Sequence, residues 1–338
     1  MKLVTFKVHT EERIGAYVGD QIVDLTSAYA LYLKEIEKKE YACKWALTLI
    51  PPCMKGFLAS GDEAFNAAKK AVDFVKKKGK TAVGLDGESI FLSESQARLC
   101  APVPKPGKIY CMAVNFYDHG TESVKDPEKR KAEIERWKSL KLDNPVTFQK
   151  GISLVCGPRD PIIKPKNTEK LDYECELGVV IGKKGKYISK DKAYEYVGGY
   201  TVFIDVSCRD QGFPPVEWEM YKRNVNWTKG KGSDNAAPMG PCLVTPDEIT
   251  NPYSPPLKLI TRVNGQVRQN GDLSTMIIHI PRMIEYLSNG TTLEPGDVIA
   301  TGTVAGVSAS WGVWLKAGDV VECEIPGIGV LKHTVVGD

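Results

Sequence analysis

Short apolar segments separated by turn residues dominate the chain from Lys108 onward, and they constrain the fold more than any other feature. Apolar runs of about four to eight residues, some alternating with polar positions, are typical of strands. Turn dipeptides such as Asn264-Gly265 and Asn289-Gly290 separate these runs. One amphipathic helix is expected over Ile280–Leu287. We predict strands in this mostly β part at 108–114, 174–181, 199–206, 257–263, 297–301 and 320–325.

The first 100 residues combine short strands with helices. Strands are expected at 3–9, 13–18 and 21–24, and helices at 28–39 and 62–77. Three prolines between Glu94 and Pro106 indicate a joint between two parts of the chain. We therefore predict an α+β protein, with a small α+β domain over residues 1–100 and a larger domain over residues 105–338.

Composition excludes several classes of protein. The 338 residues are 42% hydrophobic and 26% charged, and a net charge of +3 is too small to predict nucleic-acid or membrane binding. No apolar run approaches the ~20 residues that span a bilayer. The nine cysteines are scattered and contain no Cys-x-x-Cys pair, so neither a disulfide framework nor a zinc cluster is expected. The N-terminus has no signal-peptide pattern, and we expect a cytoplasmic protein.

Three carboxylates fall within apolar strands. Glu174 and Glu176 are two residues apart, so on a strand their side chains point to the same face. Such a pair usually lies on the solvated face of a half-buried strand, and that interpretation remains open for these two residues alone. Asp205, late in another apolar strand, adds a third carboxylate. Three carboxylates form a hard oxygen site, which suits Mg²⁺ or Mn²⁺.

A second group of residues is suited to acid–base chemistry. His119 and Glu122 are three positions apart, so within a helical turn Glu122 can orient His119 as a general base. An ordinary surface contact is the alternative interpretation. Lys231 lies in a glycine-rich loop and could reach a developing oxyanion, although lysines in such loops are usually solvated. The charged segment 125–142 predicts a helix with little apolar surface, either a solvated connector or a mobile lid.

Common cofactor and nucleophile motifs are absent from the sequence. There is no phosphate-binding Gly-x-x-x-x-Gly-Lys-Ser/Thr loop, no Gly-x-Gly-x-x-Gly motif between a strand and a helix, and no Gly-x-Ser-x-Gly motif. Nucleotide cofactors and serine hydrolase chemistry are therefore unsupported. Thr303, in a Gly/Thr loop after a strand, could hold a carboxylate, although a plain tight turn explains the loop equally well.

These motifs, in this order, resemble the fumarylacetoacetate hydrolase family. The resemblance covers roughly residues 105 to 335, and the first 100 residues match only loosely the smaller N-terminal domain of two-domain members. Val114 stands where some members that act on oxo-acids have a carboxylate-binding arginine. The matching stretches are Asn115–His119, Tyr173–Gly178, Asp205–Asp210, Gly230–Asp234, Val263–Gln266 and Gly296–Thr303.

The resemblance implies a mixed β-roll catalytic domain, a homodimer and a bound Mg²⁺ or Mn²⁺. It assigns the metal to Glu174, Glu176 and Asp205, the substrate or oxyanion to Lys231, and water activation to His119 with Glu122. Arg209, Gln211 and Thr303 are candidates for binding substrate, and Gln211 departs from the usual family spacing.

Our first hypothesis is hydrolysis of a carbon–carbon bond in a 2,4-dioxo acid of the acylpyruvate or fumarylpyruvate type. Water activated by His119 would attack the C4 carbonyl, and Lys231 would stabilise the oxyanion. The alternative is a lyase or isomerase, such as a decarboxylase, tautomerase or dehydratase, acting on a related 2-oxo acid with the same metal. A non-catalytic binding module is the third possibility, and the intact set of three acids argues against it.

Overall fold

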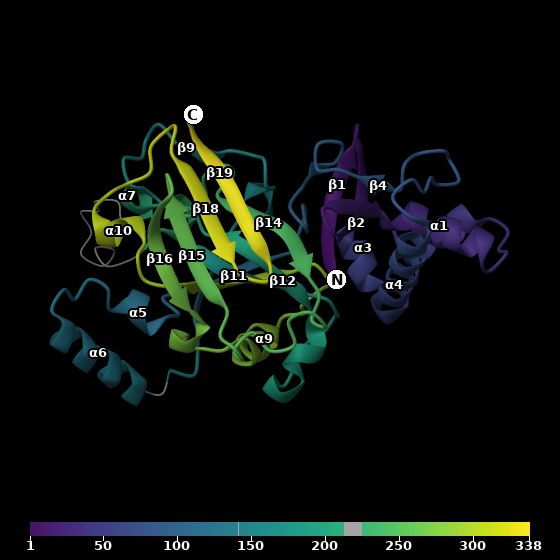
Figure 1. The fold of residues 1–338 in the computed structure, drawn as a ribbon. Helices are drawn as coiled ribbons and strands as arrows, with labels where there is room; N and C mark the ends of the chain where they lie inside the picture. The colour runs from purple at the N-terminus through teal and green to yellow at the C-terminus, as the bar shows by residue number, and fades with distance from the viewer. Residues whose placement is uncertain (141, 213–224) are drawn as a thin grey trace.

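The computed structural model describes residues 1–140, 142–212 and 225–338. Its N-terminal part, purple to blue in Figure 1, is a small sheet covered by helices. On α4 the apolar positions recur at helical spacing, and Ala64, Ala68 and Val75 are fully buried in a core shared with α1. The elements are β1 (Lys2–Val8), β2 (Glu11–Val18), β3 (Gln21–Asp24), α1 (Leu25–Glu35), α2 (Ala42–Leu49), α3 (Met54–Ala59), α4 (Gly61–Lys78), β4 (Phe91–Leu92) and β5 (Arg98–Leu99).

The remainder of the chain is mostly β, as predicted. Its helices are α5 (Tyr117–Gly120), α6 (Pro127–Ser139), α7 (Arg209–Gly212), α8 (Trp227–Gly230), α9 (Ile280–Ser288) and α10 (Ser308–Trp311), and 3₁₀ turns span 152–154, 190–196 and 273–275. Its strands are β6 (Ile109–Ala113), β7 (Val146–Gln149), β8 (Val155–Cys156), β9 (Ile162–Lys164), β10 (Leu171–Asp172), β11 (Cys175–Ile181), β12 (Val197–Ile204), β13 (Ser207–Cys208), β14 (Ala237–Val244), β15 (Lys258–Val263), β16 (Gln266–Asp272), β17 (Val298–Thr303), β18 (Val320–Ile325) and β19 (Gly329–Gly337).

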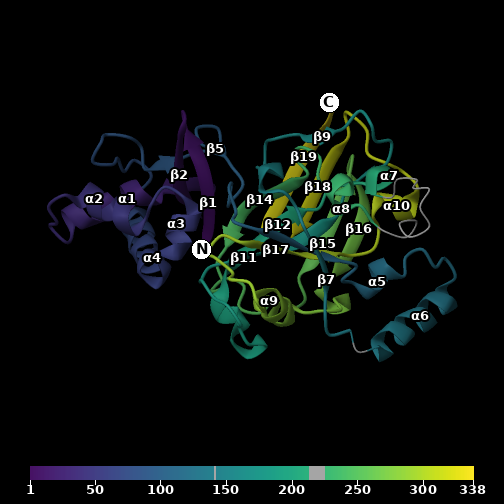
Figure 2. The same ribbon diagram turned by 180° about the vertical axis from the view of Figure 1, so that it is seen from behind.

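Two sheets pack face to face in this larger part. The large sheet runs in the order β4-β3-β2-β1-β14-β12-β11-β17-β6-β7, and a five-stranded sheet runs β16-β15-β18-β19-β9. The five-stranded sheet lies in front of β11, β12 and β14 in Figure 1 and behind them in Figure 2. Leu177, Leu259 and Val321 are fully buried in the core between the sheets. Burial of each such side chain contributes roughly 1.5–3 kcal/mol. The predicted α+β class is therefore confirmed.

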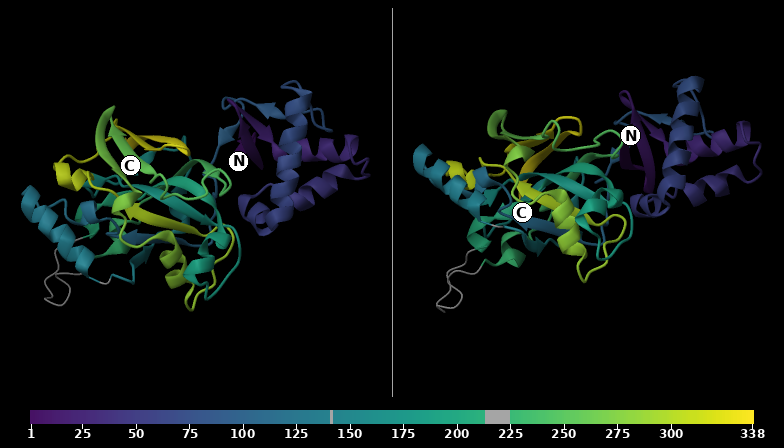
Figure 3. Two further views of the ribbon diagram at one scale, coloured as in Figure 1. Left: turned by 60° about the horizontal axis from the view of Figure 1, so that its bottom comes forward. Right: turned by 90° about the horizontal axis from the view of Figure 1, so that it is seen from below.

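The N-terminal part forms a lobe at one side of the molecule (Figure 3), but its sheet continues into the large sheet. Strand β1 pairs antiparallel with β14, with Leu3 opposite Leu243. A second core also contains residues of both parts, among them Phe57 and Val298. The two parts are thus joined by backbone hydrogen bonds as well as by a linker, and the domain limits at 1–100 and 105–338 stay a prediction.

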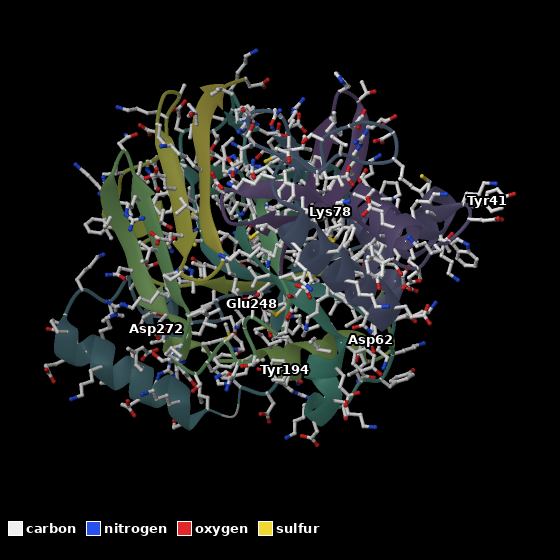
Figure 4. All side chains as sticks on the ribbon, turned by 45° about the vertical axis from the view of Figure 1, so that its right-hand side comes forward. Tyr41, Asp62, Lys78, Tyr194, Glu248 and Asp272 are labelled. Carbon is white, nitrogen blue, oxygen red and sulfur yellow. The ribbon has the colours of Figure 1, made fainter. Side chains whose placement is uncertain are left out.

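A groove of about 1150 Å³ runs between the two parts. Asp62 of α4 and Glu248, both labelled in Figure 4, are among the residues that line it. The amino group of Met1 lies 3.3 Å from the Glu248 carboxylate at this groove. Among the helices of the described residues, none is long and apolar enough to cross a membrane.

Several strands differ from the sequence-based expectation. The strand β14 was not predicted because Pro238, Gly240 and Pro241 interrupt its pattern. Its pairing with β12 shifts register near Gly240, which lets prolines occupy a strand inside the sheet. The prediction also omitted β16 and β19, the partners of the predicted strands β15 and β18.

Candidate active site

Adjacent strands bring the three predicted acids together. Glu174 immediately precedes β11, and Asp205 immediately follows its antiparallel neighbour β12. The Asp205 amide donates to the Glu174 carbonyl at 3.0 Å. The two residues therefore lie opposite each other and extend the β11–β12 pairing by one residue pair. Glu176 lies two pairs further along β11, opposite Phe203 of β12 on one side and Thr303 of β17 on the other. One carboxylate oxygen from each of the three residues lies within 4.8 Å of the others.

All three carboxylates are buried. Glu174 is 5% exposed, and Glu176 and Asp205 are each 1% exposed. Every residue of β11 is buried, because sheet neighbours flank it and the second sheet covers it. The pair Glu174 and Glu176 therefore does not lie on a solvated face. Buried carboxylates are costly unless cations or hydrogen-bond donors surround them.

Three cationic side chains meet this requirement in part. Lys231 donates from Nζ to Glu174 Oε2 at 2.7 Å and to Asp205 Oδ2 at 2.6 Å. Lys150 donates to Asp205 Oδ1 at 2.7 Å and to the Val206 carbonyl at 3.0 Å. Arg209 pairs with Glu174 and also donates from Nε to a fourth buried carboxylate, Asp172, at 2.9 Å. Counting only the residues that the structure describes, the cluster contains four carboxylates and three cations.

Neighbouring charges give two of these acids opposite pKa shifts. Burial alone would raise the pKa of Glu174, but the charges of Arg209 and Lys231 hold it below the ordinary value. Burial raises the pKa of Glu176 well above its ordinary value, and repulsion from Asp205 and Glu174 adds to the shift. Within the described residues, no lysine or arginine pairs with Glu176. Glu176 is therefore the acid most in need of a further cation.

The donor set fits a hard divalent cation. Glu176 Oε2 accepts one hydrogen bond, from the Gly302 amide at 2.8 Å. Gly302 has a φ of +92°, and a Cβ there would lie 2.9 Å from Asn115 Cβ, so glycine is required for this approach. Three carboxylates of one small cluster supply the oxygen ligands that Mg²⁺ and Mn²⁺ prefer. The residues could therefore hold a metal ion, with Glu174, Glu176 and Asp205 as its ligands.

The His119–Glu122 pair is formed as the spacing predicts. His119 lies on α5 and Glu122 in the turn that follows it, and His119 Nδ1 lies 2.7 Å from Glu122 Oε1. Glu122 Oε2 accepts from the Gly306 amide at 2.7 Å, which fixes the carboxylate against the loop after β17. A carboxylate only accepts, so the neutral imidazole carries its proton on Nδ1 and has its lone pair on Nε2. The Tyr173 hydroxyl, one residue before Glu174, donates to the Gly306 carbonyl at 3.1 Å, so the same loop joins the pair to the segment that carries Glu174.

The segment after the pair packs back onto it. Arg130 of α6 donates to the Asp118 carbonyl at 2.6 Å. The Trp137 ring covers Gly120, where a Cβ would lie 2.4 Å from the ring. Among the described residues of α6, none is buried, as expected from its composition. Its role as connector or lid stays a prediction, and residue 141 of the segment lies outside the described residues.

The predicted substrate-binding residues differ in where they point. Arg209 lies in the acid cluster and also lines the adjoining cavity. The Thr303 hydroxyl donates to the Cys175 carbonyl at 2.7 Å and accepts from Gln269, so it holds β17 to β11. The Gln211 side chain accepts a hydrogen bond from the Asn167 side-chain amide and donates one to the Asn167 carbonyl. The structure thus brings Arg209 to the site and directs Gln211 and Thr303 elsewhere.

A cavity of about 630 Å³ adjoins the cluster. Lys231 and Arg209 line its charged end, together with Ser207 and Asn115. The rest of its wall is largely apolar and includes residues of α6 and of the segment leading to β7. Cavities of 300–1,000 Å³ hold ligands of drug size. This one is therefore ample for a small oxo-acid.

Sequence analysis missed Lys150 and assigned no role to Asp172. Lys150 follows β7, and its ammonium reaches Asp205 across 55 positions of sequence. Asp172 accepts from Arg209 and from the Ser308 amide, so it anchors the guanidinium near Glu174. The only available signal was a charged residue directly after or within an apolar run, which is common at strand ends.

Comparison with protein families and curated relatives gives consistent results. Residues 108–336 match the family model described as the C-terminal domain of fumarylacetoacetate (FAA) hydrolase. A mitochondrial oxaloacetate tautomerase of Xenopus laevis is 39% identical over 289 residues, which cover 84% of this chain and 79% of the relative. The oxaloacetate tautomerase YisK of Bacillus subtilis is 36% identical over 341 residues, covering 99% of this chain and 100% of YisK.

Solved structures share the fold along the whole chain. A fumarylacetoacetate hydrolase from Exiguobacterium antarcticum is 29% identical, with a TM-score of 0.71 and full coverage of both chains. Maleylpyruvate hydrolase from Sphingobium sp. SYK-6, solved with manganese(II) and pyruvate, has a TM-score of 0.68 at 24% identity and covers 100% of this chain and 99% of its own. The fold therefore includes both tautomerases and hydrolases of oxo-acids.

Proposed function

The chain belongs to the fumarylacetoacetate hydrolase family, and we propose that it is a divalent-metal-dependent tautomerase that interconverts the enol and keto forms of oxaloacetate. Relationship to enzymes that act on oxo-acids agrees with the sequence analysis. The carbon–carbon hydrolase that we placed first there moves to second place, because the relatives at 36–39% identity are tautomerases.

The observation that carries this proposal is the similarity to YisK over 99% of this chain. The site geometry alone supports both reactions, since each needs a base and a means of stabilising negative charge on the 2-oxo oxygen. Similarity along the full length favours the reaction of that relative, because the match includes the N-terminal part and the α5–α6 segment as well as the strands that carry the three acids. Fold by itself would not distinguish the reactions.

The side chains have distinct roles in the proposed reaction. His119 Nε2, free because Nδ1 is bonded to Glu122, takes the proton from C3 of the keto form and returns it in the reverse direction. In this proposal Lys231 stabilises the negative charge that develops on the 2-oxo oxygen, and His119 delivers its proton to that oxygen to complete the enol. Arg209, which lines the cavity, holds a carboxylate of the substrate in this proposal. A bound Mg²⁺ or Mn²⁺ on Glu174, Glu176 and Asp205 would polarise the 2-oxo group as a Lewis acid.

The direct test follows the enol form of oxaloacetate by its ultraviolet absorbance. With Mg²⁺ or Mn²⁺ the enzyme should accelerate ketonisation well beyond the buffer rate, and the His119→Ala variant should lose about 10²–10⁴-fold. Asp118→Asn, next to the base but without contact to it, serves as a matched control. A wild-type enzyme that leaves the ketonisation rate unchanged would rule out the tautomerase.

Hydrolysis of a 2,4-dioxo acid is the second candidate. It is favoured by the His119–Glu122 pair, which would activate water as readily as it would move a substrate proton. The discriminating experiment supplies an acylpyruvate and measures pyruvate release alongside oxaloacetate ketonisation. Release of pyruvate without acceleration of ketonisation would restore the hydrolase to first place. The homodimer and the cytoplasmic location also stay predictions, and sedimentation analysis of purified protein tests the dimer.

A further inference from the structure

Three apolar residues at the end of α6 and just after it line the cavity beside the acid cluster. Trp137, Leu140 and Leu142 line it, although α6 buries none of its described residues. Leu140 is 45% exposed and Leu142 is 39% exposed. A leucine side chain usually stabilises a protein by being buried, and these two leucines, on an otherwise charged segment, are too exposed to contribute in that way. They form part of an apolar wall that lacks a partner among the described residues.

Three further residues of the cavity lining are also apolar. Val114 and Val146 are 49% and 64% exposed, and Ile277 is the third. Lys231 and Arg209 line the same cavity, so a ligand held by these two cations would have apolar surface available to it. The apolar wall, defined as these three residues with Trp137, Leu140 and Leu142, thus belongs to the same cavity as the candidate active site.

Val114 is the most informative residue of the wall. Its φ is +49°, a conformation that a β-branched residue rarely adopts and that costs of the order of 1–3 kcal/mol. The strained backbone presents an uncharged side chain to the cavity next to Asn115, whose amide is fixed by the Ile278 and Thr301 carbonyls. Valine here provides no charge for a second carboxylate. It provides apolar surface instead.

Oxaloacetate matches only the charged end of this cavity. It is a small diacid, and neither of its carboxylates would gain from the apolar wall, where desolvation without a partner is unfavourable. A 2-oxo acid whose C3 carries an aryl or branched alkyl group would place its carboxylate and 2-oxo group at Lys231 and Arg209 and bury the apolar group against Val114 and Leu140. The shape and chemistry of the cavity therefore suit a larger substrate than oxaloacetate.

We propose that the enzyme also enolises 2-oxo acids with an apolar group on C3, and that the apolar wall selects them. This inference rests on the proposed tautomerase function. The C3–H bond breaks and its proton passes to His119, which then delivers a proton to the 2-oxo oxygen to form the O–H bond; His119 is regenerated, the product is an isomer and no other reactant is consumed. The apolar group on C3 takes the place of the second carboxylate of oxaloacetate.

The test measures exchange of C3 protons for deuterium by NMR, with phenylpyruvate, pyruvate and oxaloacetate as probes and Mg²⁺ present. Burial of a phenyl group predicts that kcat/KM for phenylpyruvate exceeds that for pyruvate by about 10- to 100-fold. In Leu140→Asp the ratio of phenylpyruvate to oxaloacetate kcat/KM should fall at least about tenfold. Leu47→Asp, a change at a 49% exposed leucine of α2, is the matched control and should leave the ratio unchanged.

A second variant, Val114→Arg, should shift the substrate preference in the opposite direction to the one that the apolar wall provides, towards oxaloacetate. It adds a cation to the wall, so it should raise kcat/KM for oxaloacetate relative to phenylpyruvate by about tenfold or more. The inference would be overturned if kcat/KM were equal for phenylpyruvate and pyruvate, or if neither variant changed the ratio of phenylpyruvate to oxaloacetate kcat/KM. Activity with oxaloacetate would still support the proposed function in that case. No exchange with any of the three acids would instead refute the proposed function itself.

Discussion

Replacing Glu122 by glutamine tests the catalytic role of His119 with almost no change in shape. Glu122 accepts from His119 Nδ1 and from the Gly306 amide, both at 2.7 Å. Because the Gly306 amide only donates, the oxygen of the new side chain must face it, and the NH₂ group then faces His119. His119 Nδ1 has to become an acceptor, and its proton moves to Nε2. The base then has no lone pair directed at the substrate.

The size of the effect follows from the loss of general-base catalysis. We expect kcat for oxaloacetate ketonisation to fall about 10²–10⁴-fold, equivalent to about 3–5 kcal/mol of transition-state stabilisation. KM should change little, because Glu122 acts through His119 and holds no substrate in our proposal. Asp118→Asn is the matched control, since Asp118 accepts from the Ala305 amide at 3.2 Å and from Thr275 without contacting His119. The kcat of Asp118→Asn should fall by less than about tenfold.

Two measurements together decide this prediction. Stopped-flow absorbance of the enol gives kcat and KM for both variants, and ¹⁵N NMR of the imidazole reports which nitrogen of His119 carries the proton. The wild type should show the proton on Nδ1, and Glu122→Gln should show it on Nε2. Turnover within about threefold of the wild type, with the tautomer switched, would show that His119 is not the base.

Three further variants or treatments test the acid cluster. Glu176→Gln should abolish turnover yet raise the melting temperature of the metal-free protein. Burial and repulsion by Asp205 and Glu174 raise the pKa of Glu176, so its ionised form opposes folding at any pH above the ordinary carboxylate pKa. A lower melting temperature would contradict this. EDTA should inactivate the enzyme, with Mg²⁺ or Mn²⁺ restoring it better than Zn²⁺, and full activity after exhaustive chelation would refute the metal site. Lys150→Met should lower the free energy of unfolding in urea by about 3–5 kcal/mol, because it leaves Asp205 short of a buried partner, and a loss below about 1 kcal/mol would contradict that role.

The acids were predictable from sequence because their evidence is local. Glu174 and Glu176 share a strand face by the period of two, and an apolar setting for all three acids shows where charge is costly. The His119–Glu122 contact was predictable for a similar reason, since it depends only on helical spacing. Six strands of the larger part, β6, β11, β12, β15, β17 and β18, were also found from their apolar runs, and β18 was found with both ends correct.

The residues that sequence analysis missed depend on contacts between distant parts of the chain. Lys150 is a partner of Asp205 only because β7 joins the sheet beyond β6 and β17. The same limit applies to the pairing of β1 with β14, which links residues more than 230 positions apart. Thr303 and Gln211 were expected at the substrate because of their types and motif positions, yet their hydrogen bonds go to Cys175 and Asn167. Residue type indicates what a side chain can bind, and packing decides what it does bind.

The most direct test of the account is the rate at which purified enzyme converts enol-oxaloacetate to the keto form, measured with Mg²⁺ or Mn²⁺ and again after chelation. The account predicts strong acceleration with metal, little without it, and none above the buffer rate in Glu176→Gln, which lacks one of the three carboxylates within 4.8 Å of one another. Ketonisation at the buffer rate in the presence of metal, or equal acceleration by Glu176→Gln, would contradict the proposed metal-dependent tautomerase.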